Sequence, residues 1–129
     1  MEGVRVMNDT QTTIADLRQL VEQFVGERDW HQFHTPKNLA MSLAIEAAEL
    51  MEHFQWLTAE QSRAVAGQPD KLGETADELA DVFCYGLALA NELGIDVAAA
   101  IQAKMLKNAG KYPVEEYRGR FGSGDPGGE

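Results

Sequence analysis

The sequence predicts an all-α protein, a four-helix bundle. Apolar residues recur at helical spacing in four long segments, and no segment shows the alternation of a half-buried strand. Apolar residues make up 44% of the 129 residues, which is enough for a core, and the length argues for one domain. We expect this helical domain over residues 12–117, between a flexible polar arm at 1–11 and a disordered, glycine-rich tail at 118–129.

The first helix is expected over residues 13–28. Thr12 or Thr13 can cap its N-terminus, and Asp16 is favourably placed in the first turn. One face of this helix is apolar and consists of Ile14, Leu17, Leu20, Val21, Phe24 and Val25.

The second helix is expected over residues 36–56. Thr35 followed by Pro36 is typical of an N-cap and the first helical position. Apolar residues cover most of its circumference, which is typical of a central helix rather than a surface helix. After it, residues 58–72 read as a connection with at most one short helical turn, because they contain Gly67 and Pro69.

The third and fourth helices are expected over residues 71–93 and 97–107. Gly94 is a typical C-cap for the third helix, and Asp96 is a typical N-cap for the fourth. Gly110 and Pro113 are expected to end the fourth helix.

The charge of the chain limits its possible ligands. Acidic residues number 21 and basic residues 11, which gives a net charge of −10. This balance excludes a conventional duplex-binding protein, which needs a basic face, but it permits a nucleotide that is accompanied by divalent cations. A single cysteine, Cys84, excludes an intrachain disulfide and is expected in the core. No signal peptide or membrane-spanning run is evident, so a cytoplasmic protein is expected.

Four carboxylates stand inside apolar stretches of the two central helices. Glu46 and Glu49 are three residues apart on the second helix, and Glu78 and Asp81 are three apart on the third. Each pair therefore shares a helix face, and two such helices side by side would bring the four groups together. A cluster of this kind favours a hard divalent cation, Mg²⁺ or Mn²⁺. Ordinary exposed acids are the alternative, and a di-iron site is less favoured because the expected Glu-x-x-His pairs are missing.

Aromatic and basic residues form two further groups of candidates. Trp30 and Trp56 flank the second helix and could stack on a nucleobase or close the ends of the bundle, and His34 could contact a ligand or only close its loop. Spacings of four and three place Lys104, Asn108 and Lys111 on one helix face. This face could bind phosphates or simply complement the helix C-terminus.

The motifs together resemble a known family. They are RDW and FH within residues 28–34, Glu-x-x-Glu, FQW at 54–56, Glu-x-x-Asp, and KMxxNxxKYP at 104–113. In this order they resemble the MazG-type all-α nucleotide pyrophosphohydrolases, and most closely the dCTP pyrophosphatase branch. The resemblance covers residues 12–117.

The resemblance implies Mg²⁺-dependent hydrolysis of a nucleoside triphosphate between its α and β phosphates, giving the monophosphate and pyrophosphate. It also implies a homodimer or a homotetramer, with site residues from more than one subunit. The implied metal ligands are Glu46, Glu49, Glu78 and Asp81; the implied base-binding residues are Trp30 and Trp56; and the implied phosphate-binding residues are Tyr85, Lys104, Asn108, Lys111 and Tyr112.

On this basis we expect an enzyme of nucleotide-pool housecleaning that acts on dCTP or a modified dCTP. Glu49, at the centre of its helix, is the expected group that orients or deprotonates the attacking water. His34 is expected beside the base. The alternatives are a broad-specificity (d)NTP pyrophosphohydrolase and a helical metal-binding or partner module without catalysis.

Overall fold

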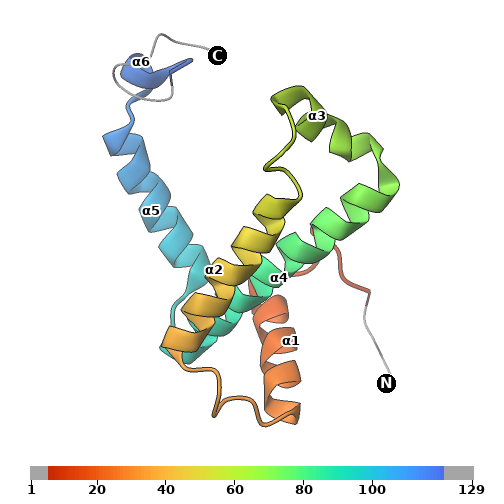
Figure 1. The fold of residues 1–129 in the computed structure, drawn as a ribbon. Coiled ribbons are helices and arrows are strands. Elements are labelled where there is room, and N and C mark those ends of the chain that lie inside the picture. The colour runs from red at the N-terminus through yellow and green to blue at the C-terminus, as the bar shows by residue number, and fades with distance from the viewer. Residues whose placement is uncertain (1–5, 121–129) are drawn as a thin grey trace. The chain divides into compact units, whose positions relative to one another are not determined.

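The computed structural model describes residues 6–120, and every regular element among them is a helix (Figure 1). The chain divides into two compact units, Met1–Ile95 and Asp96–Glu129. The first unit contains α1 (Ile14–Glu27), α2 (Pro36–Glu52), α3 (Ala59–Ala64), the 3-10 turn η1 (Val65–Gly67) and α4 (Pro69–Leu93). The second unit contains α5 (Val97–Lys111) and α6 (Val114–Tyr117). The all-α prediction and the four long helices are confirmed.

The helix starts follow local hydrogen bonding that the sequence encodes. At α1, the Asp16 N–H donates to Thr13 Oγ1 at 3.1 Å and the Asp16 carboxylate accepts from the Thr13 N–H at 3.0 Å, which is a capping box. At α2, Thr35 Oγ1 accepts from the Asn38 N–H at 3.2 Å. These contacts satisfy backbone donors that the first helical turn leaves unpaired.

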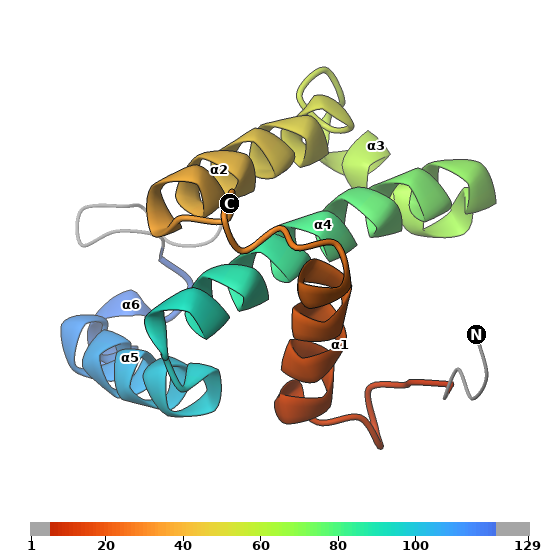
Figure 2. The same ribbon diagram turned by 90° about the horizontal axis from the view of Figure 1, so that it is seen from below.

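In the first unit, α4 is the central element of the packing. It runs alongside α2 and also contacts α1 and η1 (Figures 1 and 2). Asn91 fastens α1 to α4, because its side chain accepts from Arg18 Nε at 2.8 Å and donates to the Arg18 carbonyl at 3.1 Å. At the end of α4, Gly94 has a φ of 65°, a left-handed conformation that costs glycine little.

Three helix boundaries differ from the sequence prediction, and the predicted connection after α2 contains a helix of its own. Helix α2 ends at Glu52 rather than at residue 56, because the chain turns at His53. The segment after it forms the capped helix α3, and α4 begins at Pro69, two residues before the predicted start. Helix α5 continues to Lys111, so Gly110 lies inside it instead of ending it.

The two ends of the chain are described only in part. The expected N-terminal arm includes a turn at residues 8–12, in which Asn8 Oδ1 accepts from the Thr10 and Gln11 N–H groups at 3.1 and 2.9 Å. Near the other end, α6 was not predicted. Residues 1–5 of the expected arm and residues 121–129 of the expected tail lie outside the described residues. The domain boundaries remain predictions.

Much of the apolar surface of the single chain is bare. The buried apolar residues among those described are Val25, Leu39, Val65, Leu87, Ala88 and Ala90. Large apolar side chains stay exposed on every long helix, including Phe24, Ile45, Phe83 and Leu106. Within residues 6–120, no single helix has the length and apolar character to cross a membrane, although α4 and α5 taken together would pass that test.

Candidate functional site

Three carboxylates converge where α2 packs along α4. Glu46 and Glu49 come from α2 and Glu78 comes from α4, and each offers an oxygen within 4.8 Å of the others. Helical spacing explains the arrangement, since residues three apart on α2 project from one face, which here meets α4.

The three carboxylates of the cluster would repel one another if all were ionised. Burial raises the pKa of Glu46 to about 7, with further increases from a hydrogen bond to Glu49 and from the charges of Glu49 and Asp81. Burial also raises the pKa of Glu78, followed by the charge of Glu49. Without a cation, the cluster therefore retains protons at a pH where isolated glutamates would be ionised.

The same carboxylates contain oxygens that lack partners. Glu46 Oε2 and Glu78 Oε2 are buried and have no hydrogen-bond donor among the described residues. Buried carboxylate oxygens without donors are costly, and a divalent cation would satisfy them. The donor set is all oxygen, which suits Mg²⁺ or Mn²⁺ rather than a softer metal. The residues therefore fit the cation that the sequence led us to expect.

Asp81 has a different place from the other three predicted ligands. It is not among the oxygens that converge, but its charge acts on both Glu46 and Glu78. Asp81 also lines a neighbouring cavity of about 540 Å³. It therefore stands between the carboxylate cluster and this cavity.

The cavity is formed by α1, α4 and the loop between α1 and α2. The loop contributes Trp30 and His34, and α4 contributes Asp81 and Tyr85. The rings of Trp30 and His34 lie 6.0 Å apart, and Phe24 packs edge-on against Trp30 at 5.6 Å. Trp30 and His34, both predicted to bind the base, therefore line the same cavity as Tyr85 and Asp81.

One polar atom in this cavity has no partner. His34 Nδ1 is buried and lacks a hydrogen-bond partner among residues 6–120. Around it the lining is largely apolar. A bound molecule could satisfy this atom while its flat face contacts Trp30.

The comparison with protein families agrees with this arrangement. The model of the MazG-like family matches residues 41–120, which include most of α2, all of α4 and all four predicted carboxylates. The chain belongs to the MazG-like family. The family resemblance stated from the motifs is confirmed.

Relatives of this MazG-like chain are similar over most of its length. It is 40% identical to dCTP pyrophosphatase 1 of Rattus norvegicus over 109 residues, which are 84% of this chain and 64% of that protein. It is 39% identical to dCTP pyrophosphatase 1 of Homo sapiens over 104 residues, which are 81% of this chain and 61% of that protein. The chain thus spans somewhat less than two thirds of these curated relatives.

A solved structure shares the fold. The crystal structure of a pyrophosphatase from Archaeoglobus fulgidus is 36% identical and superposes with a TM-score of 0.73. The match covers 84% of this MazG-like chain and 99% of the other.

Other predicted site residues are not part of the cavity. Trp56 lies in the turn after α2, is 86% exposed, and does not line the cavity within one chain. Apart from Tyr85, the predicted phosphate-side residues belong to the second unit: Lys104, Asn108 and Lys111 are on α5, and Tyr112 follows it. In that unit, Lys111 Nζ lies 5.3 Å from the ring centre of Tyr112. The roles of these residues stay predictions.

The apolar wall of the cavity was not predicted from the sequence to be part of a site. Leu20, Val21, Phe24 and Val25 of α1 line it, although their periodicity indicated only a core face. Cys84 lines it from α4 and is exposed, so its expected place in the core was wrong. Partial burial and then the charge of Asp81 raise the pKa of its thiol, so it stays protonated. The sequence could not distinguish the two cases, because apolar residues follow the same helical spacing whether they line a cavity or pack in a core.

Proposed function

We propose that this MazG-like protein is a Mg²⁺-dependent pyrophosphohydrolase that cleaves a deoxynucleoside triphosphate, dCTP or a modified dCTP, between the α and β phosphates. The observation that carries the proposal is the juxtaposition of three converging carboxylates with a cavity that contains Trp30, His34 and Tyr85. Asp81 lines the cavity, and its charge acts on Glu46 of the cluster. Similarity to dCTP pyrophosphatases over 81–85% of the chain supports the choice of substrate.

In this proposal the acidic cluster binds the cation. Glu46, Glu49 and Glu78 would hold Mg²⁺, or Mn²⁺ in its place, with Asp81 completing the set from the cavity side. When bound, the cation neutralises phosphate charge and acidifies water. Glu49 orients the attacking water and accepts its proton. The water oxygen bonds to the α phosphorus as the bond to the leaving pyrophosphate breaks, so monophosphate and pyrophosphate are released.

The cavity would bind the nucleoside end of the substrate. Trp30 offers an aromatic face, and His34 Nδ1 is a buried polar atom without a partner, suited to the edge of a base. Tyr85 lies one helical turn from Asp81 on α4 and lines the same cavity, so its hydroxyl is the candidate donor to a phosphate near the cluster.

A second copy of the chain would complete the site as a homodimer, or as a homotetramer formed from two dimers. The exposed apolar side chains on α2 and α4 support an interface, since Ile45 is 57% and Phe83 63% exposed in the single chain. Trp56 would then reach a base from the partner subunit, since it does not line the cavity of its own chain. On α5, Lys104, Asn108 and Lys111 share one face and would bind the phosphate chain together with Tyr112.

Product analysis tests the proposal directly. The purified protein is incubated with each of the common dNTPs, with and without Mg²⁺, and the products are resolved by anion exchange. We expect monophosphate and pyrophosphate only with the metal, and the fastest release from dCTP. Diphosphate and phosphate would contradict the proposed bond, and equal rates with all bases would favour a broad-specificity enzyme. No turnover would favour a non-catalytic helical module.

A matched pair of variants locates the activity in the cluster. Glu49→Gln removes the proposed base, whereas Glu52→Gln changes an exposed glutamate one turn further along α2. We expect the first to lose turnover and the second to retain it. Equal activity of both would contradict the assignment of Glu49.

A further inference from the structure

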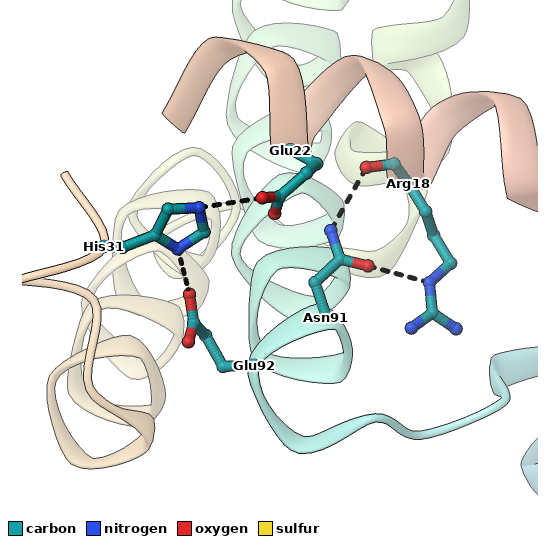
Figure 3. Close-up of polar contacts among 5 residues, drawn as sticks. All are labelled: Arg18, Glu22, His31, Asn91 and Glu92. Atoms are coloured by element: carbon teal, nitrogen blue, oxygen red, sulfur yellow. Dashed lines mark hydrogen bonds and ion pairs between the residues drawn. The ribbon is translucent and has the colours of Figure 1, made fainter. Parts of the chain in front are cut away.

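His31 bridges two helices from the loop that carries Trp30. Its Nδ1 lies 2.6 Å from a carboxylate oxygen of Glu92 on α4, and its Nε2 lies 2.8 Å from one of Glu22 on α1 (Figure 3). The side chain of Glu92 is 25% exposed, and those of His31 and Glu22 are 42% and 51% exposed. One imidazole thus joins three separate segments of the first unit.

The bridge requires a doubly protonated ring. Ionised carboxylates only accept hydrogen bonds, so both ring nitrogens must donate. The hydrogen bond to Glu92 raises the pKa of His31 most, followed by the one to Glu22. The bridge is therefore complete below the ordinary histidine pKa of about 6.5, and it is lost as the pH rises through the higher pKa of the folded protein.

Few other charged groups face the bridge. From α1 there is Arg18, which lines the same surface hollow and is held by the side chain of Asn91. From α4 there is only Glu92 itself among the lining residues. On the loop, the Asp29 carboxylate accepts from the Gln32 side chain at 3.3 Å, and the ring of His34 lies beside Trp30. The pairing with two carboxylates therefore dominates the environment of His31.

The bridge is coupled to the cavity through the loop backbone. Trp30 directly precedes His31 and its N–H donates to the Val25 carbonyl at 3.0 Å. The N–H of His34 approaches the carbonyls of Trp30 and His31 at 3.0 and 3.2 Å. Fixing His31 between α1 and α4 therefore fixes the turn that presents Trp30 and His34. The same two helices form the cavity walls.

We propose that His31 is a positioning residue: by bridging Glu22 and Glu92, it holds the Trp30–His34 turn against the cavity and so sets the affinity for the substrate base. The effect on substrate rests on the proposed function, but the effect on Trp30 does not. Neither His31 nor its two partners belongs to the acidic cluster. The prediction is a base affinity that weakens with rising pH as the bridge opens.

An NMR titration without substrate tests the structural part. The sequence has three histidines and two tryptophans, so ring and indole resonances can be followed individually, and Trp56→Phe assigns the Trp30 indole. We expect the Trp30 indole shift to follow the titration midpoint of His31. In Glu92→Gln that midpoint should fall and the Trp30 response should fall with it. In His31→Gln the response should vanish, whereas His53→Gln should leave it unchanged.

Kinetics test the functional part. His31→Gln should raise KM by about threefold at pH 6, a modest loss because the ion pairs are partly exposed, with kcat unchanged. His31→Arg keeps a cation with several donors, and it should restore KM and flatten its pH dependence. The proposal is overturned if the pH response of the Trp30 indole shift is the same in His31→Gln and Glu92→Gln as in the parent. It is also overturned if His31→Gln lowers kcat and leaves KM unchanged. If no nucleotide is hydrolysed, the proposed function fails, and the titration still decides the role of His31.

Discussion

Replacing Glu46 with glutamine should raise the free energy of unfolding when no metal is present and lower it relative to the parent when Mg²⁺ is bound. In the metal-free protein, Glu46 is an acid whose pKa in the fold is about 7 instead of 4.5. Such a group destabilises the fold wherever it must ionise, that is, increasingly from about pH 4.5 to about pH 7 and fully above that. Glutamine carries no charge and removes this penalty.

The size of the effect follows from the shift. The pKa change from 4.5 to about 7 sets an upper limit of about 3 kcal/mol, since one pKa unit corresponds to ~1.36 kcal/mol. Solvent near the cluster screens part of this, which leaves about 1–2 kcal/mol. In EDTA at pH 8, Glu46→Gln should therefore be more stable than the parent by about that amount. At pH 4 the difference should disappear.

With Mg²⁺ present, the parent should be more stable than Glu46→Gln. A cation that binds only the folded protein stabilises it by ~2.7 kcal/mol at one hundred times its Kd. The parent should gain this stabilisation, and Glu46→Gln should lose most of it because one of three converging carboxylates is gone. Urea unfolding followed by circular dichroism, with and without Mg²⁺ at fixed protein concentration, measures both free energies of unfolding.

The control is Glu74→Gln, which changes an exposed glutamate on α4 outside the cluster. It should change stability little at either pH and leave the response to Mg²⁺ intact. If Glu46→Gln is no more stable than the parent in EDTA at pH 8, the carboxylates do not repel one another as described. If it keeps the full response to Mg²⁺, Glu46 is not a ligand.

Three further substitutions test other parts of the molecule. Glu49→Gln should lower kcat by about 100-fold or more and retain the helical circular dichroism spectrum, and a loss of that spectrum would indicate a structural role instead. Trp30→Ala should weaken nucleotide binding by ~1–3 kcal/mol, measured by calorimetry, and an unchanged Kd would place the base elsewhere. Gly94→Ala should lower the free energy of unfolding by about 1–2 kcal/mol, because the φ of 65° is strained for alanine, and no change would mean that the turn readily relaxes.

The helix starts could be predicted because their signals are local. Thr13 with Asp16 and Thr35 with Pro36 act within one turn, and the structure uses both. The end of α2 was misjudged, since apolar and aromatic residues continue the helical period beyond His53 while the backbone already turns. Gly110 was misread for the converse reason, because a helix tolerates one glycine at a modest cost.

The site was predictable to the extent that helix geometry fixes it. Spacing alone placed Glu46 and Glu49 on one face, and packing of α2 along α4 then brought Glu78 to them. Spacing could not show that Asp81 would turn toward the cavity, because that depends on how α1 lies against α4. The bridge at His31 joins residues 61 positions apart, and no local pattern can encode such a contact.

The exposed apolar side chains have a consequence for newly synthesised chains. Among residues 6–120 few large apolar side chains are buried, so a single chain gains little hydrophobic stabilisation from folding, and the proposed dimer would add to it. Helix α2 carries Ile45, 57% exposed, directly beside Glu46 of the acidic cluster. If the proposed dimer completes the site, we expect newly synthesised chains to be inactive until they associate. The concentration of the protein, and not only that of its substrate, would then determine when activity begins.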